Sequence, residues 1–210
     1  MIIIKSSAEL EIMRRAGRLV GRVLQAVATA AKPGATTAEL DQMAEQMCRD
    51  EGALPAFKGY RGYPYSLCCS LNHEVVHGFP RKEPLREGDL LSVDFGVLLD
   101  GFYGDSALTV AVGEVSPEAR ALIDATRRSL EAGIAQCRAG NRLGDVSHAI
   151  QQVVEPAGFA VVRDFAGHGI GRALHEEPQV PNYGTPGTGL RLRRGMTLAI
   201  EPMVNAGTAE

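Results

Sequence analysis

The sequence predicts an α/β fold of two related halves, each with helices covering an antiparallel sheet. Four amphipathic helical segments occur as two pairs, one early and one late in the chain. Apolar strand segments follow each pair, and helices and strands both recur at a nearly constant offset. With 210 residues and 45% hydrophobic content, the chain can bury a sizeable core in one domain, or at most in two small ones.

The predicted helices begin at capping signals and end at glycine. Ser6-Ser7-Ala8-Glu9 and Thr36-Thr37-Ala38-Glu39 are both capping boxes, in which a hydroxyl and a glutamate satisfy the first free amides of a helix. Apolar residues follow each box at helical spacing. The four predicted helices span residues 6–32, 36–52, 116–140 and 146–158.

Self-comparison shows the repeat. Gly34, Leu40, Ala44, Met47 and Gly52 recur 106 residues later as Gly140, Val146, Ile150, Val153 and Gly158. Arg86, Gly88, Leu91, Val93 and Asp94 recur 107 residues later as Arg193, Gly195, Leu198, Ile200 and Glu201. Two copies are too few for a solenoid. We therefore predict a single domain, 1–210, with a first half of about 1–113 and a second half of about 114–210.

Two aspartates fall on one face of a predicted hairpin. Residues 89–98 alternate as a strand, Asp100-Gly101 is a two-residue turn signal, and residues 107–112 return. The turn pairs Leu99 with Phe102, Asp94 with Ala107 and Gly96 with Asp105. Asp94 and Asp105 are then diagonal neighbours with β-carbons about 7–8 Å apart, which suits a dinuclear metal site. The alternative is an exposed pair of aspartates on a polar face.

The repeat favours the metal site. Glu201, the counterpart of Asp94, is predicted to lie in the apolar strand that includes Thr197–Ile200, where an unpaired carboxylate would be costly. His168 lies in Gly167-His168-Gly169, where glycines allow close backbone approach, and His175-Glu176-Glu177-Pro178 follows seven residues later. An isolated histidine is more often structural, but this setting favours a functional role.

His73-Glu74-Val75-Val76-His77 spells a zinc-peptidase motif, which works only on a helix. The stretch is short and ends at Gly78-Phe79-Pro80, so no helix is expected there. In an extended chain the two histidines would lie about 13 Å apart, too far to share one zinc.

Charge and cysteine usage narrow the class of protein. A net charge of −3 argues against a nucleic-acid partner. No apolar run approaches a membrane span and no basic leader is present, so a cytoplasmic protein is expected. The four cysteines contain no C-x-x-C pair, and reduced thiols are expected.

Several motifs together resemble a methionine aminopeptidase of the type I class, in the pita-bread metallopeptidase family. They are Tyr60-Arg61-Gly62-Tyr63-Pro64, Asn72 through Pro80, Asp94, Asp100 through Asp105, Gly167 through Gly171, His175 through Pro178 and Ile200 through Met203. The resemblance implies two pseudo-symmetric halves around a dinuclear metal site. It also implies removal of the N-terminal methionine from nascent proteins or peptides with a small second residue, by attack of a metal-bound hydroxide.

The resemblance assigns a role to each motif residue. Asp94 chelates one metal, Asp105 bridges both, and His168 and Glu201 bind the other, with Glu201 also relaying a proton. His77 and His175 are catalytic and contact the substrate. The implied methionine pocket comprises Phe57, Tyr60, Tyr63, Cys68 and Leu174, although ordinary core side chains remain the alternative.

The resemblance also bears on class, metal and partners. Glu201 follows His168 by only 33 residues, which leaves no room for a type II insertion. Carboxylate and imidazole ligands accept manganese, iron, cobalt or zinc. A peptide substrate, transient ribosome contact and a monomer are expected, although an exposed sheet edge would favour association.

One family ligand is missing from the pattern. A late bridging glutamate would fall at residue 212 or beyond, and Glu210 follows a turn-like stretch and is not assigned as a ligand. The chain is therefore expected to be C-terminally incomplete, to bind one metal more readily than two, and to be weak or inactive. The alternatives are a non-catalytic peptide-binding module and a proline-specific dipeptidase.

Overall fold

The computed structural model describes residues 2–209, which form two compact units. The N-terminal unit comprises Ser7–Ser116 and Gly171–Leu174. The C-terminal unit comprises residues 2–6, Pro117–Ile170 and residues 175–209. The prediction of a single domain in two halves stays a prediction, and Glu210 lies outside the described residues.

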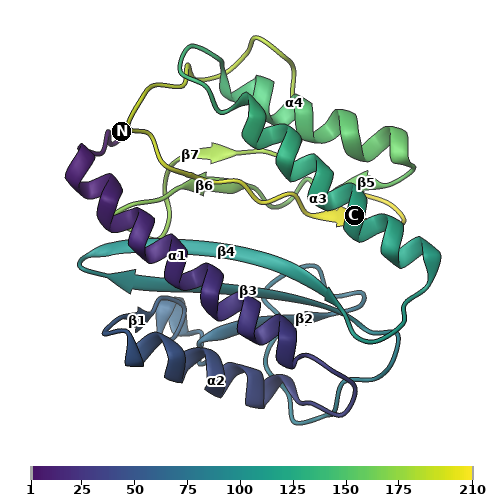
Figure 1. Ribbon diagram of the computed structural model, residues 1–210. Coiled ribbons are helices and arrows are strands. Elements are labelled where there is room, and N and C mark those ends of the chain that lie inside the picture. The colour runs from purple at the N-terminus through teal and green to yellow at the C-terminus, as the bar shows by residue number, and fades with distance from the viewer. Residues whose placement is uncertain (1, 210) are drawn as a thin grey trace. The chain divides into compact units, whose positions relative to one another are not determined.

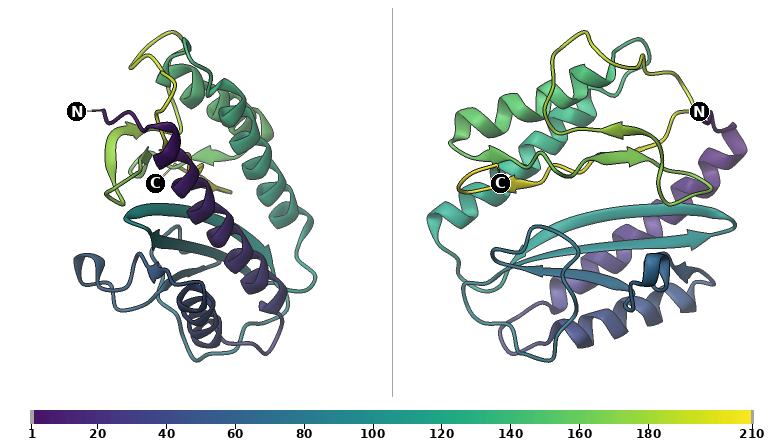
Figure 2. Two further views of the ribbon diagram at one scale, coloured as in Figure 1. Left: turned by 60° about the vertical axis from the view of Figure 1, so that its left-hand side comes forward. Right: turned by 180° about the vertical axis from the view of Figure 1, so that it is seen from behind.

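In the N-terminal unit, two helices cover one face of an antiparallel sheet (Figure 1, Figure 2). Its elements are α1 (Ser7–Ala30), α2 (Thr37–Asp50), β1 (Leu54–Pro55), the 3-10 helix η1 (Tyr60–Gly62), β2 (Leu67–Leu71), β3 (Leu90–Leu99) and β4 (Phe102–Ala111). Strand β3 is central, with β4 along one edge and β1 and β2 along the other.

The core of this unit lies between the helices and the sheet. The apolar stripe of α1, including Leu19, Val20 and Val23, is buried in one cluster with Val93 and Phe95 of β3. Helix α2 begins at the predicted capping box, in which Thr36 accepts from the Glu39 amide and the Glu39 carboxylate accepts from the Thr36 amide. A single apolar face on each helix therefore fixes which side of the sheet it covers.

The predicted hairpin is confirmed residue by residue. Leu99 pairs with Phe102, Asp94 with Ala107 and Gly96 with Asp105. Asp100 and Gly101 both have positive φ, 49° and 79°, as the predicted two-residue turn requires. Asp94 and Asp105 lie on the sheet face opposite α1. Their chain neighbours Val93, Phe95 and Gly104 face the helix, and successive residues of a strand point to opposite faces.

The C-terminal unit also packs two helices against short antiparallel strands (Figure 1, Figure 2). Its elements are α3 (Pro117–Gln136), α4 (Leu143–Val154), the 3-10 helix η2 (Glu155–Ala157), β5 (Ala160–Val161), β6 (Gly167–Gly169), β7 (Glu176–Val180), β8 (Leu198–Ala199) and β9 (Val204–Asn205). Strand β6 pairs with β7 on one side and β8 on the other, and β5 pairs with β9. Val146, Ile150 and Val154 of α4 centre the core of this unit.

The sequence repeat is visible in matching turns. Gly34 donates to the Leu85 carbonyl at 2.8 Å, and its counterpart Gly140 donates to the Leu192 carbonyl at 3.0 Å. The amides of Asp89 and Met196, at the 107-residue offset, donate to the carbonyls of Arg86 and Arg193, each at 3.2 Å. The repeated glycines at 34, 52, 88, 140, 158 and 195 all have positive φ. These positions favour glycine because it has no Cβ.

Strand β8 is shorter than the predicted Thr197–Ile200 strand. Pairing stops at Ala199, and Glu201 lies two residues beyond it. Pro202 follows directly, and its missing amide prevents continuation of the ladder.

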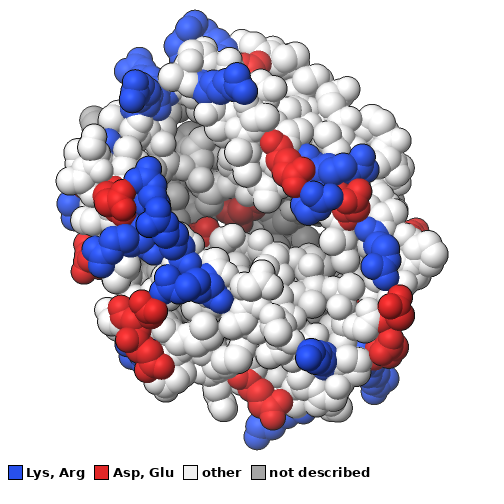
Figure 3. All heavy atoms as spheres, in the orientation of Figure 1, with Lys and Arg blue, Asp and Glu red and all other residues white. Residues whose placement is uncertain are grey.

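The surface carries both signs of charge, and the face seen in Figure 3 shows basic and acidic side chains in contact at several places. Arg14 and Arg22 of α1 pair with Glu11 and Glu51, with more than half of each side chain exposed. All four cysteines are free thiols, as expected. No helix within residues 2–209 is long and apolar enough to cross a membrane.

Candidate metal centre

Asp94 and Asp105 lie on adjacent central strands of the N-terminal unit. Both side chains are half-buried on the sheet face that the helices leave uncovered. Gly96, opposite Asp105, makes room for an aromatic ring, because a Cβ there would lie 2.8 Å from Phe57 Cε1. The two carboxylates thus share a face that also carries Phe57 at its side.

Cys68 lies directly opposite Asp94 in the β2–β3 ladder, so the thiol and the carboxylate share a face. Burial is the main cause that raises the pKa of Cys68 to about 12, and the charges of Asp94 and Asp105 add to it. The thiol is therefore neutral at physiological pH. A neutral buried thiol behaves as a small apolar group.

Tyr63 joins the segment before β2 to the segment after it. Its hydroxyl lies 3.0 Å from both the Leu67 and the Gly78 carbonyl oxygens, either of which can accept its proton. Its ring meets Tyr65 and Phe79 edge to face, with centroids 6.0 and 5.3 Å away. Tyr60 lies in η1 nearby in sequence, and Leu174 is buried in the same unit.

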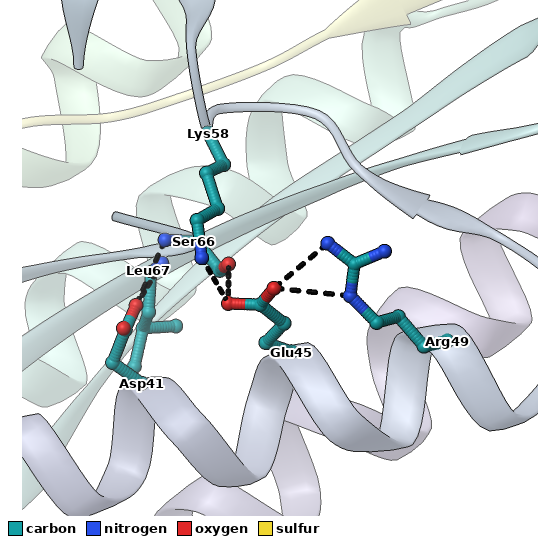
Figure 4. Close-up of polar contacts among 6 residues, drawn as sticks. All are labelled: Asp41, Glu45, Arg49, Lys58, Ser66 and Leu67. Carbon is teal, nitrogen blue, oxygen red and sulfur yellow. Dashed lines mark hydrogen bonds and ion pairs between the residues drawn. The ribbon is translucent and has the colours of Figure 1, made fainter. Parts of the chain in front are cut away.

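Helix α2 fixes the ends of the segment that carries these aromatic residues (Figure 4). Oδ1 of Asp41 accepts from the amides of Ser66 and Leu67, both at 2.8 Å. One turn later, Glu45 accepts from Lys58 Nζ at 2.6 Å and from Ser66 Oγ at 3.0 Å. Burial raises the pKa of Asp41, and the two amides counteract part of that rise. These contacts were not predictable from the sequence, because the residues that they join are 13 to 26 positions apart.

His77 lies in an irregular segment, and residues 73–77 form no helix, as predicted. Its φ of 61° is unusual for a residue with a Cβ. The following Gly78 packs against β2, where a Cβ would lie 2.2 Å from the Cys69 carbonyl oxygen. His77 lines a pocket of about 490 Å³ together with residues 74–76, Gly78, Phe79 and Arg81.

His168 and Glu201 meet in the C-terminal unit, with His168 Nε2 and Glu201 Oε1 3.2 Å apart. His168 Nδ1 lies 2.8 Å from the Gly169 carbonyl oxygen, which can only accept a proton, so Nδ1 carries it. Nε2 therefore faces a carboxylate oxygen, and Glu201 Oε1 has no properly oriented hydrogen bond among residues 2–209. Imidazole nitrogen and carboxylate oxygen are both usual ligands of a divalent cation.

The glycines beside His168 make room for neighbouring strands. A Cβ at Gly167 would lie 2.3 Å from the Ala199 carbonyl oxygen, and one at Gly169 would lie 2.2 Å from the Glu177 carbonyl oxygen. The imidazole of His175 lies beside that of His168, with centroids 4.2 Å apart and the two ring planes tilted by 40°. His168 and His175, both predicted as site residues, are therefore neighbours in this unit.

The four predicted metal ligands are divided two and two between the units. Among residues 2–209, no group of three or more His, Cys, Asp or Glu side chains is arranged to hold a metal ion. The donor types fit a divalent cation, since carboxylate and imidazole are its usual protein ligands. A four-ligand centre stays a prediction.

Residues 11–209 match the sequence model of metallopeptidase family M24. The chain belongs to this family. This metallopeptidase is 54% identical to the methionine aminopeptidase of Clostridium acetobutylicum over 99% of this chain and 84% of that protein. The crystal structure of methionine aminopeptidase from Thermotoga maritima matches with a TM-score of 0.98 at 50% identity, covering 100% of this chain and 85% of that one.

The metallopeptidase therefore has the pita-bread fold of methionine aminopeptidases, as the sequence predicted. The prolidase of Pyrococcus horikoshii matches with a TM-score of 0.80, but at 22% identity over 96% of this chain and 56% of that one. Identity this low shows the shared fold alone.

Proposed function

We propose that this metallopeptidase is a methionine aminopeptidase, which removes the N-terminal methionine from nascent proteins or peptides whose second residue is small. The observation that carries the proposal is the high identity to methionine aminopeptidases along nearly the whole chain. The hairpin carboxylates and the His168–Glu201 pair supply residue types that such a metallopeptidase needs.

The proposed ligands are Asp94, Asp105, His168 and Glu201, for divalent manganese, iron, cobalt or zinc. The 3.2 Å approach of His168 Nε2 to Glu201 Oε1 supports this assignment, because imidazole and carboxylate are both usual ligands of these cations. When bound, such ions lower the pKa of water and polarise a peptide carbonyl.

The remaining groups orient the substrate and move a proton. In the proposed mechanism, the Glu201 carboxylate takes the proton from the attacking water and passes it towards the leaving amine. His175 donates a hydrogen bond to the scissile carbonyl as that oxygen gains negative charge. His77 contacts the scissile amide.

The methionine side chain is proposed to bind beside the hairpin face. Phe57 over Gly96, and Cys68 opposite Asp94, support this placement because both flank the carboxylates. Tyr60, Tyr63 and Leu174 complete the proposed pocket. An unbranched apolar side chain suits such a surface of aromatic rings and a neutral thiol.

The proposal includes a cytoplasmic location, a monomer, and transient contact with the ribosome where nascent chains emerge. The protein does not recognise a nucleic-acid sequence, since its proposed substrate is the peptide itself.

The test is release of free methionine from Met-Ala-Ser by metal-free protein supplied with manganese or cobalt, beside a chelated control and an Xaa-Pro dipeptide. Metal-dependent release from Met-Ala-Ser alone is the expected result. Cleavage of the Xaa-Pro dipeptide instead would establish a proline-specific dipeptidase. Binding of Met-Ala-Ser with no release at any metal concentration would establish a non-catalytic peptide-binding module.

A further inference from the structure

We infer that Asn182 is a positioning residue for Glu201, and that it sets the affinity of the metal centre without touching the metal. The inference rests on the proposed function, because it needs Glu201 as a ligand. Asn182 Nδ2 donates to the backbone carbonyl of Glu201 at 2.7 Å. The Asn182 residue is 0% exposed.

The two equivalent ligands of the repeat are supported differently. Asp94 lies in the middle of β3, where its backbone is paired with Cys68 on one side and Ala107 on the other. Glu201 lies two residues past β8 and belongs to no strand pairing. A ligand in an irregular segment needs other contacts to hold it, because sub-ångström placement governs how well a metal is bound.

Three features restrain the Glu201 backbone, and His168 contacts its side chain. Asn182 holds the carbonyl, and Pro202 restricts Glu201 to an extended backbone. Gly167 passes so close that a Cβ there would lie 3.4 Å from the Glu201 amide nitrogen. Together with the His168 contact on the carboxylate, these fix both ends of the residue.

The Asn182 amide is retained at a cost. Its Oδ1 is buried and has no hydrogen-bond partner among residues 2–209. An unsatisfied buried acceptor is unfavourable, and an apolar side chain of similar shape would avoid it. Among residues 2–209, the hydrogen bond of the Asn182 side chain is the one to Glu201, so loss of Asn182 is expected to affect metal binding more than folding.

The experiment measures Mn²⁺ affinity of the metal-free protein by titration calorimetry for Asn182→Leu, Glu201→Gln and Asn141→Leu. Asn141 is the matched control, because its Nδ2 also donates to a backbone carbonyl, that of Gln136, at 3.0 Å. Asn182→Ala removes the donor without adding volume and replaces the Leu variant if that one does not fold. Thermal unfolding of each metal-free variant reports on folding separately.

The expected result is a 10- to 100-fold loss of Mn²⁺ affinity for Asn182→Leu, as for other groups that hold a ligand in place. Glu201→Gln weakens binding at least as much, Asn141→Leu does not, and the unfolding midpoint of Asn182→Leu falls no further than that of the control. If Asn182→Leu binds Mn²⁺ as tightly as the wild type while Glu201→Gln binds it more weakly, the inference is overturned and the proposed function is unaffected. Unchanged affinity in both overturns the ligand role of Glu201 as well. Equal loss in the Asn141 control overturns positioning in favour of general loosening.

Discussion

Replacing Lys5 by methionine is expected to destabilise the protein by about 3–5 kcal/mol, because it removes the charged lysine from a buried ion pair. Lys5 Nζ pairs with the Glu176 carboxylate, and the two side chains are only 3% and 7% exposed. The Lys5 amide also donates to the Gly195 carbonyl at 2.8 Å. For a chain of this size, the loss corresponds to a fall of roughly 6–20 °C in the unfolding midpoint.

The assay is urea and thermal unfolding of metal-free wild type and Lys5→Met. Arg14→Met is the matched control, because Arg14 also pairs with a glutamate, Glu11, but both side chains are more than half exposed. That exposed pair contributes less than about 1 kcal/mol. The double variant Lys5→Met/Glu176→Leu removes both charges and is expected to recover most of the loss.

Two results would refute this reasoning. A Lys5→Met variant within about 1 kcal/mol of wild type would show that water solvates the Glu176 carboxylate as well as it does an exposed group. A double variant no more stable than the single one would show that the loss comes from packing of the lysine stem and not from the broken ion pair. Either outcome would remove the ion pair as the anchor of residues 2–6.

Three further predictions concern other parts of the chain. Hydrogen bonds, first that from Lys58, lower the pKa of Glu45 from 4.5 to about 2. The ionised carboxylate therefore stabilises the fold above pH 4.5, and this stabilisation is lost as the pH falls towards 2. The Glu45→Gln substitution should therefore lower the free energy of unfolding by about 1–2 kcal/mol at pH 7, after allowance for the exposed partners of Glu45, and hardly at all near pH 2. Equal urea midpoints for the variant and the wild type at pH 7 would contradict this. Gly167→Ala should destabilise by at least about 1–3 kcal/mol in chemical unfolding, because the new Cβ meets the Ala199 backbone oxygen, whereas Gly207→Ala, which meets nothing within 4 Å, should not. An aromatic disulfide reagent should label one thiol of the folded chain, that of Cys137, because the other three cysteines are buried. After unfolding it should label all four. Labelling of two or more thiols in the folded protein would show that a buried cysteine is accessible.

The hairpin was predictable because its information is local. A two-residue turn with Asp100 and Gly101 fixes the register of both strands, and the alternation of apolar residues fixes which face meets the helices. The positions of Asp94 and Asp105 then follow without knowledge of any distant residue. The capped start of α2 was predictable for the same reason.

The supporting contacts were not predictable, since they join residues far apart in sequence. Lys5 and Glu176 are separated by 171 positions, and Asp41 and Ser66 by 25. A lysine near a chain terminus and an aspartate on an amphipathic helix both have the composition of solvent-exposed residues. Only packing shows that they are buried and paired.

The length of strand β8 was mispredicted because the apolar pattern was weighed without the proline that follows it. Thr197 to Ile200 has the composition of a strand, but pairing ends at Ala199 and Glu201 falls outside it. The repeat itself suggested a strand, since Asp94 at the equivalent position lies within one. Self-similarity thus identified Glu201 as the counterpart of Asp94, although the backbone around the two residues differs.

That divergence follows from what each part of the repeat requires. The turns at Gly88 and Gly195 need a left-handed residue, which one glycine supplies whatever lies around it, so both copies keep the same local structure. A strand ladder instead depends on its neighbours. Asp94 has partners on both sides, whereas Glu201 is followed by a proline and its carbonyl accepts a hydrogen bond from the side chain of Asn182. Turns that depend on a single glycine therefore keep the same local structure in both copies of the repeat. A ligand position that depends on neighbouring strands is supported by different residues in each copy.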